Sequence, residues 1–394
     1  MTQSYYQTPQ YQTKPRKYKG WGCLMFILVP ILLVVLIIVG IFFIYPKLSP
    51  NSLKGDLVDM TYVAGKDGSG KLWVVSDGSF YYVSSYETPG HKEWGSKCLF
   101  CKLYTYIYDP VQKKIIQTLQ TDYDGLPPKT KLFYVDGSVW VVNRDQFENL
   151  PAIHKYNAQT GEEIMNTDGF IKKFPQLSAG ITELSINENP SALDITTSDG
   201  QSFFYSIEYD KLFANRKEMN EFFKKTDTEI KTVFMLAEES GTPRKILYKV
   251  KGPGSIINDE HMLSNQLDDP ENLKRHYDSE STLLTPDRVF IEGIILCYTD
   301  DAAVILHQNR VGKKADRLLT CVNADGEVRW TIPPTELFEE LKIDEEEDPF
   351  SKIFFMKDKI SGSISDNVMI FKLTPVGIIG FDFKTGKKLW TVEF

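Results

Sequence analysis

Two cysteines three positions apart, Cys98 and Cys101, form the pattern in this chain that most directly permits chemistry. A Cys-x-x-Cys pair can serve a thiol oxidoreductase, supply half of a zinc site, or close a local disulfide. The pair lies between strand-like segments and does not open a helix, which disfavours redox catalysis. A zinc site would need two more ligands, for which Cys297 and Cys321 are candidates; these two could also form a second bridge or stay as buried thiols. We favour a Cys98–Cys101 disulfide formed in an oxidising compartment.

Other residue types give no catalytic constellation. The acidic run 344–348 lacks the alternating ligands and the glycine of a calcium loop, so we expect a solvated loop. The sequence contains no nucleophile elbow, phosphate-binding loop or dinucleotide fingerprint. The histidines show no paired spacing; they are His91, His154, His261, His276 and His307. We therefore predict no catalytic and no metal-binding residues, and the sequence identifies no cofactor-binding residue.

An uncharged run of 25 residues, from Trp21 to Tyr45, predicts a transmembrane helix, because about 20 residues cross the hydrocarbon core. A cleaved signal peptide would have a shorter apolar region and a small-residue cleavage site, which this run lacks. We expect an uncleaved signal-anchor at residues 21–45 that contacts membrane lipid. Its representative anchor residues are Trp21, Leu28, Leu33, Ile38 and Phe43.

Charge sets the orientation of this anchor. Four basic residues and no acidic ones precede it, which keeps residues 1–20 in the cytoplasm and places residues 46–394 outside. Residues 1–20 are rich in Tyr, Gln and Thr and should form a disordered tail. Removing the tail's four basic residues from the chain's 45 leaves 41 against 53 acidic residues, a net charge of −12 for residues 46–394. Such a domain should not bind nucleic acid.

Strand signals recur after the anchor, in keeping with an aromatic content of 13%. Short β-branched or aromatic runs flank turn residues and predict antiparallel hairpins. The runs are 71–76 and 79–84 around Asp77-Gly78, 131–135 and 138–142 around Asp136-Gly137, and 192–197 and 202–207 around residues 198–201.

A second kind of hairpin repeats along the chain: an apolar strand, then Asp or Asn, usually Gly, a polar pair, and an apolar residue or Trp. Successive copies begin 48 residues apart in the first half and 59 apart in the second. A period of this size, with several strands per unit, indicates a β-propeller of four-stranded blades, about seven in number. The repeat positions are Asp109; Asn157 and Gly161; Asn323, Gly326 and Trp330; and Asp382, Gly386 and Trp390.

The last copy, Asp-x-x-Thr-Gly-x-x-x-Trp from Asp382 to Trp390, resembles the repeat of quinoprotein-alcohol-dehydrogenase-like propellers. The stretches 157–164 and 323–330 resemble it less fully, so the likeness covers about four blades. It implies an all-β propeller of seven or eight blades. Catalytic members of the family hold pyrroloquinoline quinone over a Trp floor, with calcium and an acidic base. This chain has no adjacent cysteine pair and no residue that matches the base, so the resemblance implies a noncatalytic scaffold.

The chain's final segment, 389–394, should be a strand, and 57–63 is its expected partner or blade neighbour. Three inserts interrupt the pattern. They lie near 211–231, with a helix at Asn215–Lys225; near 256–281, with a helical turn at Asp269–Tyr277; and near 335–350, with Thr335 as N-cap.

These patterns predict a membrane-anchored extracytoplasmic propeller that binds a protein or ligand in the cell envelope without catalysis. An envelope protein is the expected partner. Two alternatives stay open. One is a membrane-anchored quinoprotein-like oxidoreductase that uses pyrroloquinoline quinone with calcium. The other is an envelope sensor that signals through residues 1–20.

Overall fold

The computed structural model divides the chain into two compact units, Met1–Ser52 and Leu53–Phe394. It describes residues 29–36, 53–65, 70–88, 91–123, 128–144, 151–187, 192–226, 230–238, 242–254, 270–312, 315–333, 360–373 and 377–393. In the first unit residues 29–36 are helical. No helix among the described residues has the length and apolar character to cross a membrane. The remainder of the predicted anchor lies outside the described residues.

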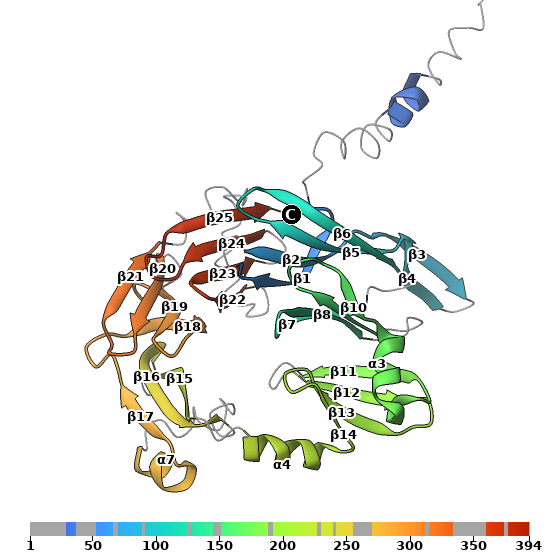
Figure 1. The fold of residues 1–394 in the computed structure, drawn as a ribbon. Helices are drawn as coiled ribbons and strands as arrows, with labels where there is room; N and C mark the ends of the chain where they lie inside the picture. Colours follow the sequence, from blue (N-terminus) through green and yellow to red (C-terminus); the bar gives the residue numbers. More distant parts are fainter. Residues whose placement is uncertain are drawn as a thin grey trace, which may run out of the picture. The chain divides into compact units, whose positions relative to one another are not determined.

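The second unit is built from antiparallel strands, which confirms the all-β prediction (Figure 1). Sheet 1 contains β1 (Asp56–Val63), β2 (Lys71–Asp77), β5 (Lys102–Asp109) and β6 (Lys114–Asp122). Sheet 2 contains β7 (Lys129–Val135), β8 (Ser138–Arg144), β9 (Ala152–Asn157) and β10 (Glu163–Met165). Sheet 3 contains β11 (Ile181–Asn187), β12 (Ala192–Thr197), β13 (Ser202–Ser206) and β14 (Lys211–Phe213).

Sheet 4 is larger because β16 pairs with two later strands as well as with β15. Its strands are β15 (Ile230–Glu238), β16 (Arg244–Pro253), β17 (Glu280–Leu283), β18 (Phe290–Tyr298), β19 (Ala302–Gln308), β20 (Arg317–Asn323) and β21 (Val328–Ile332). Sheet 5 contains β22 (Ile360–Ser365), β23 (Val368–Leu373), β24 (Gly377–Asp382) and β25 (Lys388–Glu393). The expected pattern of four-stranded units therefore holds for four of the five large sheets.

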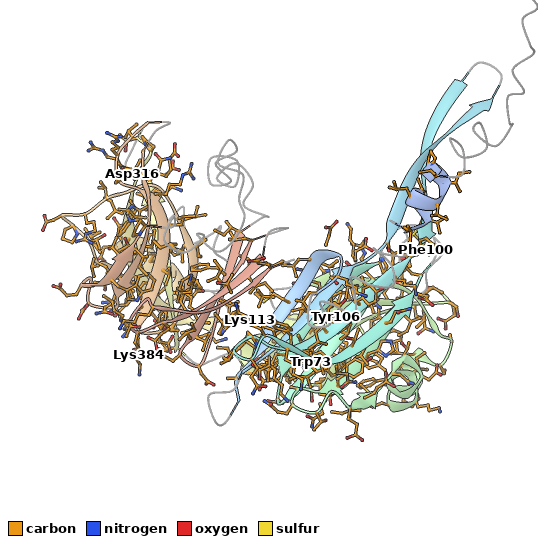
Figure 2. All side chains as sticks on the ribbon, turned by 90° about the horizontal axis from the view of Figure 1, so that it is seen from above. Trp73, Phe100, Tyr106, Lys113, Asp316 and Lys384 are labelled. Carbon is orange, nitrogen blue, oxygen red and sulfur yellow. A yellow bond between two sulfur atoms is a disulfide. The ribbon has the colours of Figure 1, made fainter. Side chains whose placement is uncertain are left out.

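Residue patterns explain the layers within a sheet. β19 reads Ala-Ala-Val-Ile-Leu-His-Gln and is buried along its whole length, as expected for a strand covered on both faces. β6 alternates between exposed and half-buried residues, as expected for an outer strand. Figure 2 shows Trp73 and Tyr106 within the body of sheet 1, where both side chains are buried.

Core clusters define which sheets are neighbours. Sheets 2 and 3 share a cluster, as do sheets 1 and 2, sheets 1 and 5, and sheets 4 and 5. The packing order is therefore 3–2–1–5–4, and the first sheet of the unit packs against the last. Tyr62 of β1 stacks on Trp390 of β25 with ring centroids 5.9 Å apart, so these segments are neighbours and not paired strands. No core cluster of described residues joins sheets 3 and 4.

The two Asp-Gly sequences have different outcomes. Asp136 and Gly137 adopt φ values of 48° and 70° and connect β7 to β8, which confirms that hairpin. The hairpin predicted around Asp77-Gly78 is wrong, because β2 pairs with β5. The intervening chain forms a separate two-stranded sheet of β3 (Phe80–Thr88) and β4 (His91–Phe100). The Gly78 N–H donates to the Lys102 carbonyl at 2.9 Å, so the chain leaves and re-enters sheet 1 at one point.

Two of the three predicted inserts contain helices. α4 (Arg216–Thr226) follows sheet 3, where Met219 is buried and Phe222 packs beside Phe213. α7 (Pro270–Tyr277) precedes β17. The described residues also include α3 (Thr167–Lys173) and the 3₁₀ helix η2 (Pro175–Leu177) between sheets 2 and 3. The third insert, with Thr335 and the acidic run, lies outside the described residues.

Candidate functional site

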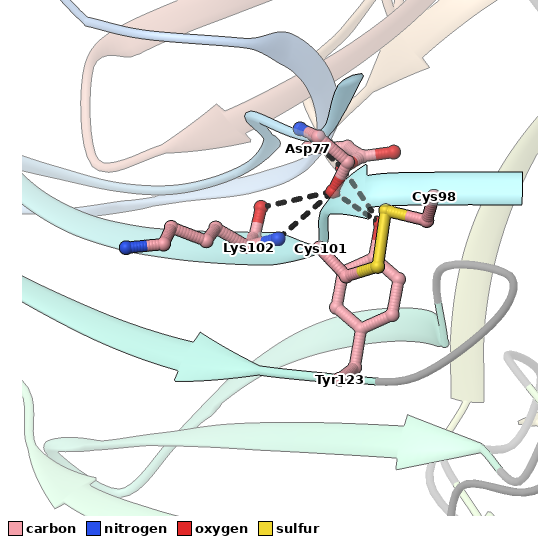
Figure 3. The surroundings of a disulfide bond; sticks show 6 residues. Asp77, Cys98, Cys101, Lys102 and Tyr123 are labelled. Atoms are coloured by element: carbon pink, nitrogen blue, oxygen red, sulfur yellow. Dashed lines mark hydrogen bonds between the residues drawn. A yellow bond between two sulfur atoms is a disulfide. The ribbon is translucent and has the colours of Figure 1, made fainter. Parts of the chain in front are cut away.

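The structure places a disulfide between Cys98, at the end of β4, and Cys101, just before β5 (Figure 3). The two Cα atoms are 5.8 Å apart, within the usual range for a disulfide. No helix begins here, unlike the arrangement of a thioredoxin-like motif. The bridge lies at the base of the β3–β4 hairpin, where the chain passes from β4 into β5.

A hydrogen-bond network fixes the same base (Figure 3). Asp77 Oδ1 accepts hydrogen bonds from the Ser79 N–H at 3.0 Å and from the Tyr123 hydroxyl at 2.9 Å. The Lys102 N–H donates to Ser79 Oγ at 2.9 Å. These contacts hold the two chain crossings of the hairpin against sheet 1, beside the disulfide.

Cys297 and Cys321 are free, buried thiols. They lie on β18 and β20, each opposite Val304 of the intervening β19. Two strand spacings separate them by roughly 9.5 Å, which is too far for a disulfide. Burial raises the pKa of Cys321 to about 11 and raises that of Cys297 as well, so both stay protonated at neutral pH. The described residues contain no group of three metal-ligating side chains.

The repeat positions form Asx turns between paired strands. Asp382 Oδ1 accepts from the Thr385 N–H at 2.7 Å, and Asn157 Oδ1 accepts from the Thr160 N–H at 2.9 Å. Asp109 Oδ1 accepts from the Gln112 N–H at 2.8 Å. Each side chain thus replaces a backbone acceptor inside the turn.

Asn323 departs from this pattern. Its Oδ1 accepts from Arg329 Nε at 2.8 Å, while its backbone carbonyl accepts from the Gly326 N–H at 2.9 Å. The backbone hydrogen bond still closes the turn, but the Asn323 side chain binds Arg329 across the hairpin instead of a backbone N–H within the turn.

The repeat turns also contact the neighbouring sheet. Trp330 Nε1 donates to the Phe383 carbonyl at 2.9 Å, which joins sheet 4 to sheet 5. Trp73 Nε1 donates to the Ala158 carbonyl at 3.0 Å, which joins sheet 1 to sheet 2 in the same way. Trp73 is not among the predicted repeat positions, although its indole contacts the repeat turn of the next sheet.

Gly161 and Gly386 lie close to a neighbouring sheet, whereas Gly326 lies close to the chain just after β17 of its own sheet 4. A Cβ atom on Gly386 would lie 2.8 Å from Trp330 Cδ2, and one on Gly326 would lie 2.2 Å from the Leu284 carbonyl oxygen. A Cβ on Gly161 would lie 2.4 Å from Ile107 Cδ1. At Gly161 and Gly386 the repeat turns therefore dock one sheet on the next.

The remaining predicted positions are structural or lie elsewhere. Trp390 is buried against Tyr62 between sheets 5 and 1. Leu33 lies in the helix at 29–36 and is exposed. The other anchor positions, Trp21, Leu28, Ile38 and Phe43, lie outside the described residues.

A cavity of about 750 Å³ is the candidate binding site. Strands β15, β18 and β22 line it, and β16 contributes one residue. Its size falls within the range of small-molecule sites. The lining residues are Phe234, Met235, Leu236, Lys245, Gly293, Ile294, Ile295, Leu296, Cys297, Tyr298, Ile360, Ser361 and Gly362.

β18, which lines this cavity, is an irregular strand. The register with β19 shifts between Ile291 and Ile294 and again between Ile295 and Cys297, so β18 contains two bulges. Glu292 adopts a φ of 49° at the first bulge. Bulges re-aim side chains and often occur beside functional sites. The glycine inside this apolar run, Gly293, is the sequence signal for such a bulge.

Lys245 is the one charged residue among the described residues that line the cavity. Its side chain is 21% exposed, and its Nζ lies 3.9 Å from Oε1 of Glu238, which is 71% exposed. The other lining side chains are mostly apolar, and the Cys297 thiol is protonated. This set of groups suits binding of an apolar body beside a single cation.

No family model matches the chain, and no curated protein matches it. Solved structures give distant likenesses. Hydrazine synthase of Kuenenia stuttgartiensis is 10% identical over 84% of this chain and 78% of its own, with a TM-score of 0.27. Apo AztD of Citrobacter koseri is 12% identical over 85% and 86%, with a TM-score of 0.22. Sqt1 of Saccharomyces cerevisiae is 10% identical over 87% and 88%, with a TM-score of 0.21. At these scores the likenesses assign neither family nor function.

Proposed function

We propose that this chain is a single-pass membrane protein that presents a noncatalytic, quinoprotein-like β-propeller outside the cytoplasm as a binding scaffold. The uncharged run at 21–45, with its basic flank, supports the anchor and its orientation. The propeller is supported by antiparallel sheets that pack in sequence through shared clusters and repeat turns.

The observation that carries the binding function is the cavity along β15, β18 and β22. Most of its lining residues are of apolar types, one is a cation, and its thiol stays protonated. An envelope protein or a small ligand would occupy it.

Photo-crosslinking tests this proposal on the full chain in native membranes. A photoreactive amino acid at Ser361, an exposed lining residue of β22, should give a reproducible adduct after illumination. The matched control is Leu389 of β25, which is 49% exposed and lies outside the cavity. Equal adducts at both positions, or none at Ser361, would contradict binding at the cavity.

Membrane attachment has its own test. The full chain should remain with membranes after an alkaline carbonate wash, and a chain lacking residues 1–45 should be released. Protease added outside the cytoplasm should reach residues 46–394 and not the tail. Release of the full chain by the wash would contradict the anchor.

A further inference from the structure

We infer that the cavity along β15, β18 and β22 binds an amphipathic monoanion, with its anionic head at Lys245 and its apolar body along β18. This inference rests on the proposed binding function and specifies the ligand class. Four observations support it: the two unlike ends of the cavity, its single cation, the apolar types of most lining residues, and the net charge of residues 46–394.

The two ends of the cavity differ. At one end Lys245 pairs with Phe290 at the start of β18, and Gly293 lies against Leu236. At the other end Tyr298 lies near Phe234, with ring centroids 6.1 Å apart. At about 3.3 Å per residue, β18 covers roughly 16 Å from Gly293 to Tyr298. An elongated ligand therefore fits better than a compact one.

Lys245 determines the charge of the ligand. Its ammonium group offers three donors, and its carboxylate neighbour, Glu238, is mostly exposed at 3.9 Å. Because Glu238 is largely in solvent and the two groups are 3.9 Å apart, this ion pair is weak, and a bound anion can replace it at small cost. With one cation among the described lining residues, the cavity matches a single negative charge.

Apolar side chains determine the body of the ligand. Leu236, Ile294 and Ile360 contribute from three different strands, and burial keeps the Cys297 thiol neutral. No carboxylate lines the cavity in the described residues, which disfavours a metal ion. The net charge of −12 on residues 46–394 disfavours a polyanion such as a nucleotide. A carboxylate or sulfonate with an aryl or alkyl body fits these limits.

The test compares two probes of the same shape, a fluorophenyl-butyrate and its neutral amide. Binding is measured by fluorine NMR on the full chain in lipid nanodiscs, with empty nanodiscs as reference. The acid should bind more tightly than the amide. Lys245→Gln should weaken acid binding about tenfold and leave amide binding unchanged, because it removes one charge-assisted hydrogen bond.

Lys251→Gln is the matched control, since Lys251 is an exposed lysine of the same strand outside the cavity. Equal acid binding by the two lysine variants would overturn the inference, as would equal binding of acid and amide by the unmodified chain.

Ser361→Trp narrows the cavity from an exposed position and should weaken the binding of both probes. If both probes bind equally and Ser361→Trp weakens both, the cavity binds ligands and the anion preference alone fails. Absence of both probe binding and the Ser361 photo-adduct would remove the proposed function as well.

Discussion

Polar side chains inside sheet 4 bond to one another. His307 Nε2 lies 2.8 Å from Thr320 Oγ1, which in turn lies 3.2 Å from Thr331 Oγ1. His307 Nδ1 lies 3.0 Å from the Gln308 carbonyl and can donate to it. The imidazole therefore has a donor and an acceptor contact while neutral, and burial disfavours its charged form.

This histidine should make stability depend on pH. Burial, and to a lesser extent the charge of Arg288, lowers the pKa of His307 below its usual value of about 6.5. The unfolded chain then takes up this proton more readily than the folded chain. The free energy of unfolding should be level above about pH 6.5 and should fall as the pH drops below it. Urea unfolding at about pH 7.5 and 5.5 measures this change.

The control for the pH effect is His307→Gln, which keeps a polar side chain and removes the titrating group. The decline between the two pH values should shrink in this variant. An undiminished decline would assign the effect to other groups.

At the scale of elements, the repeat turns act as docking devices. In the turns at 157–161 and 382–386 the Asx side chain closes the turn and the glycine approaches the next sheet. Gly386 has a φ of 69° and lies beside Trp330 and Ile332 of sheet 4. Mutation can separate the effect of this contact on stability from the effect of the left-handed backbone conformation.

Gly386→Ala should destabilise the domain by about 3 kcal/mol, from left-handed strain together with overpacking against sheet 4. Gly200→Ala is the matched control, because Gly200 has a φ of 79° but no atom within 4 Å of a new Cβ. Its cost should be about 1 kcal/mol, from backbone strain alone. Chemical denaturation of both variants gives the difference. Equal losses would show that the turn does not dock.

The turn residues predicted much of the structure at the scale of single hairpins. Asp136-Gly137 needs positive φ at both residues, and such a turn joins strands by itself. Asp77-Gly78 carries the same signal, yet β2 pairs with β5, because a pairing partner is chosen by the whole sheet. The cavity could not be predicted either, since β15, β18 and β22 meet only through tertiary packing. Gly293 indicates a bulge in β18, but it does not indicate which strands lie opposite that bulge.

At the scale of the second unit, one carboxylate connects three sheets. Asp59 of sheet 1 accepts a hydrogen bond at Oδ2 from the Leu132 N–H of sheet 2, at 2.9 Å. Its Oδ1 lies 3.4 Å from Nζ of Lys372 in sheet 5. The same ammonium group donates to the Val58 carbonyl at 2.8 Å. Both side chains are largely buried, so this pair ties the first sheet to the last.

Lys372→Met should destabilise the domain by about 3 kcal/mol, because it leaves the carboxylate of Asp59 buried without its cation. Adding Asp59→Asn should recover part of the loss, so that the double variant costs less than the sum of the two single variants. Thermal and urea unfolding of the four proteins provide the comparison. Additive losses would show that the two side chains do not interact.

The Lys372–Val58 contact can form only late in synthesis of the chain. The two residues are 314 positions apart in the chain. At about 5–20 residues per second, a ribosome needs roughly 15–60 s to make the second after the first. Throughout that interval the apolar face around Tyr62 lacks its packing partner, Trp390, which has not yet been synthesised. We therefore expect this face of the first sheet to stay uncovered until synthesis is nearly complete, and a chain truncated before Trp390 to leave it exposed.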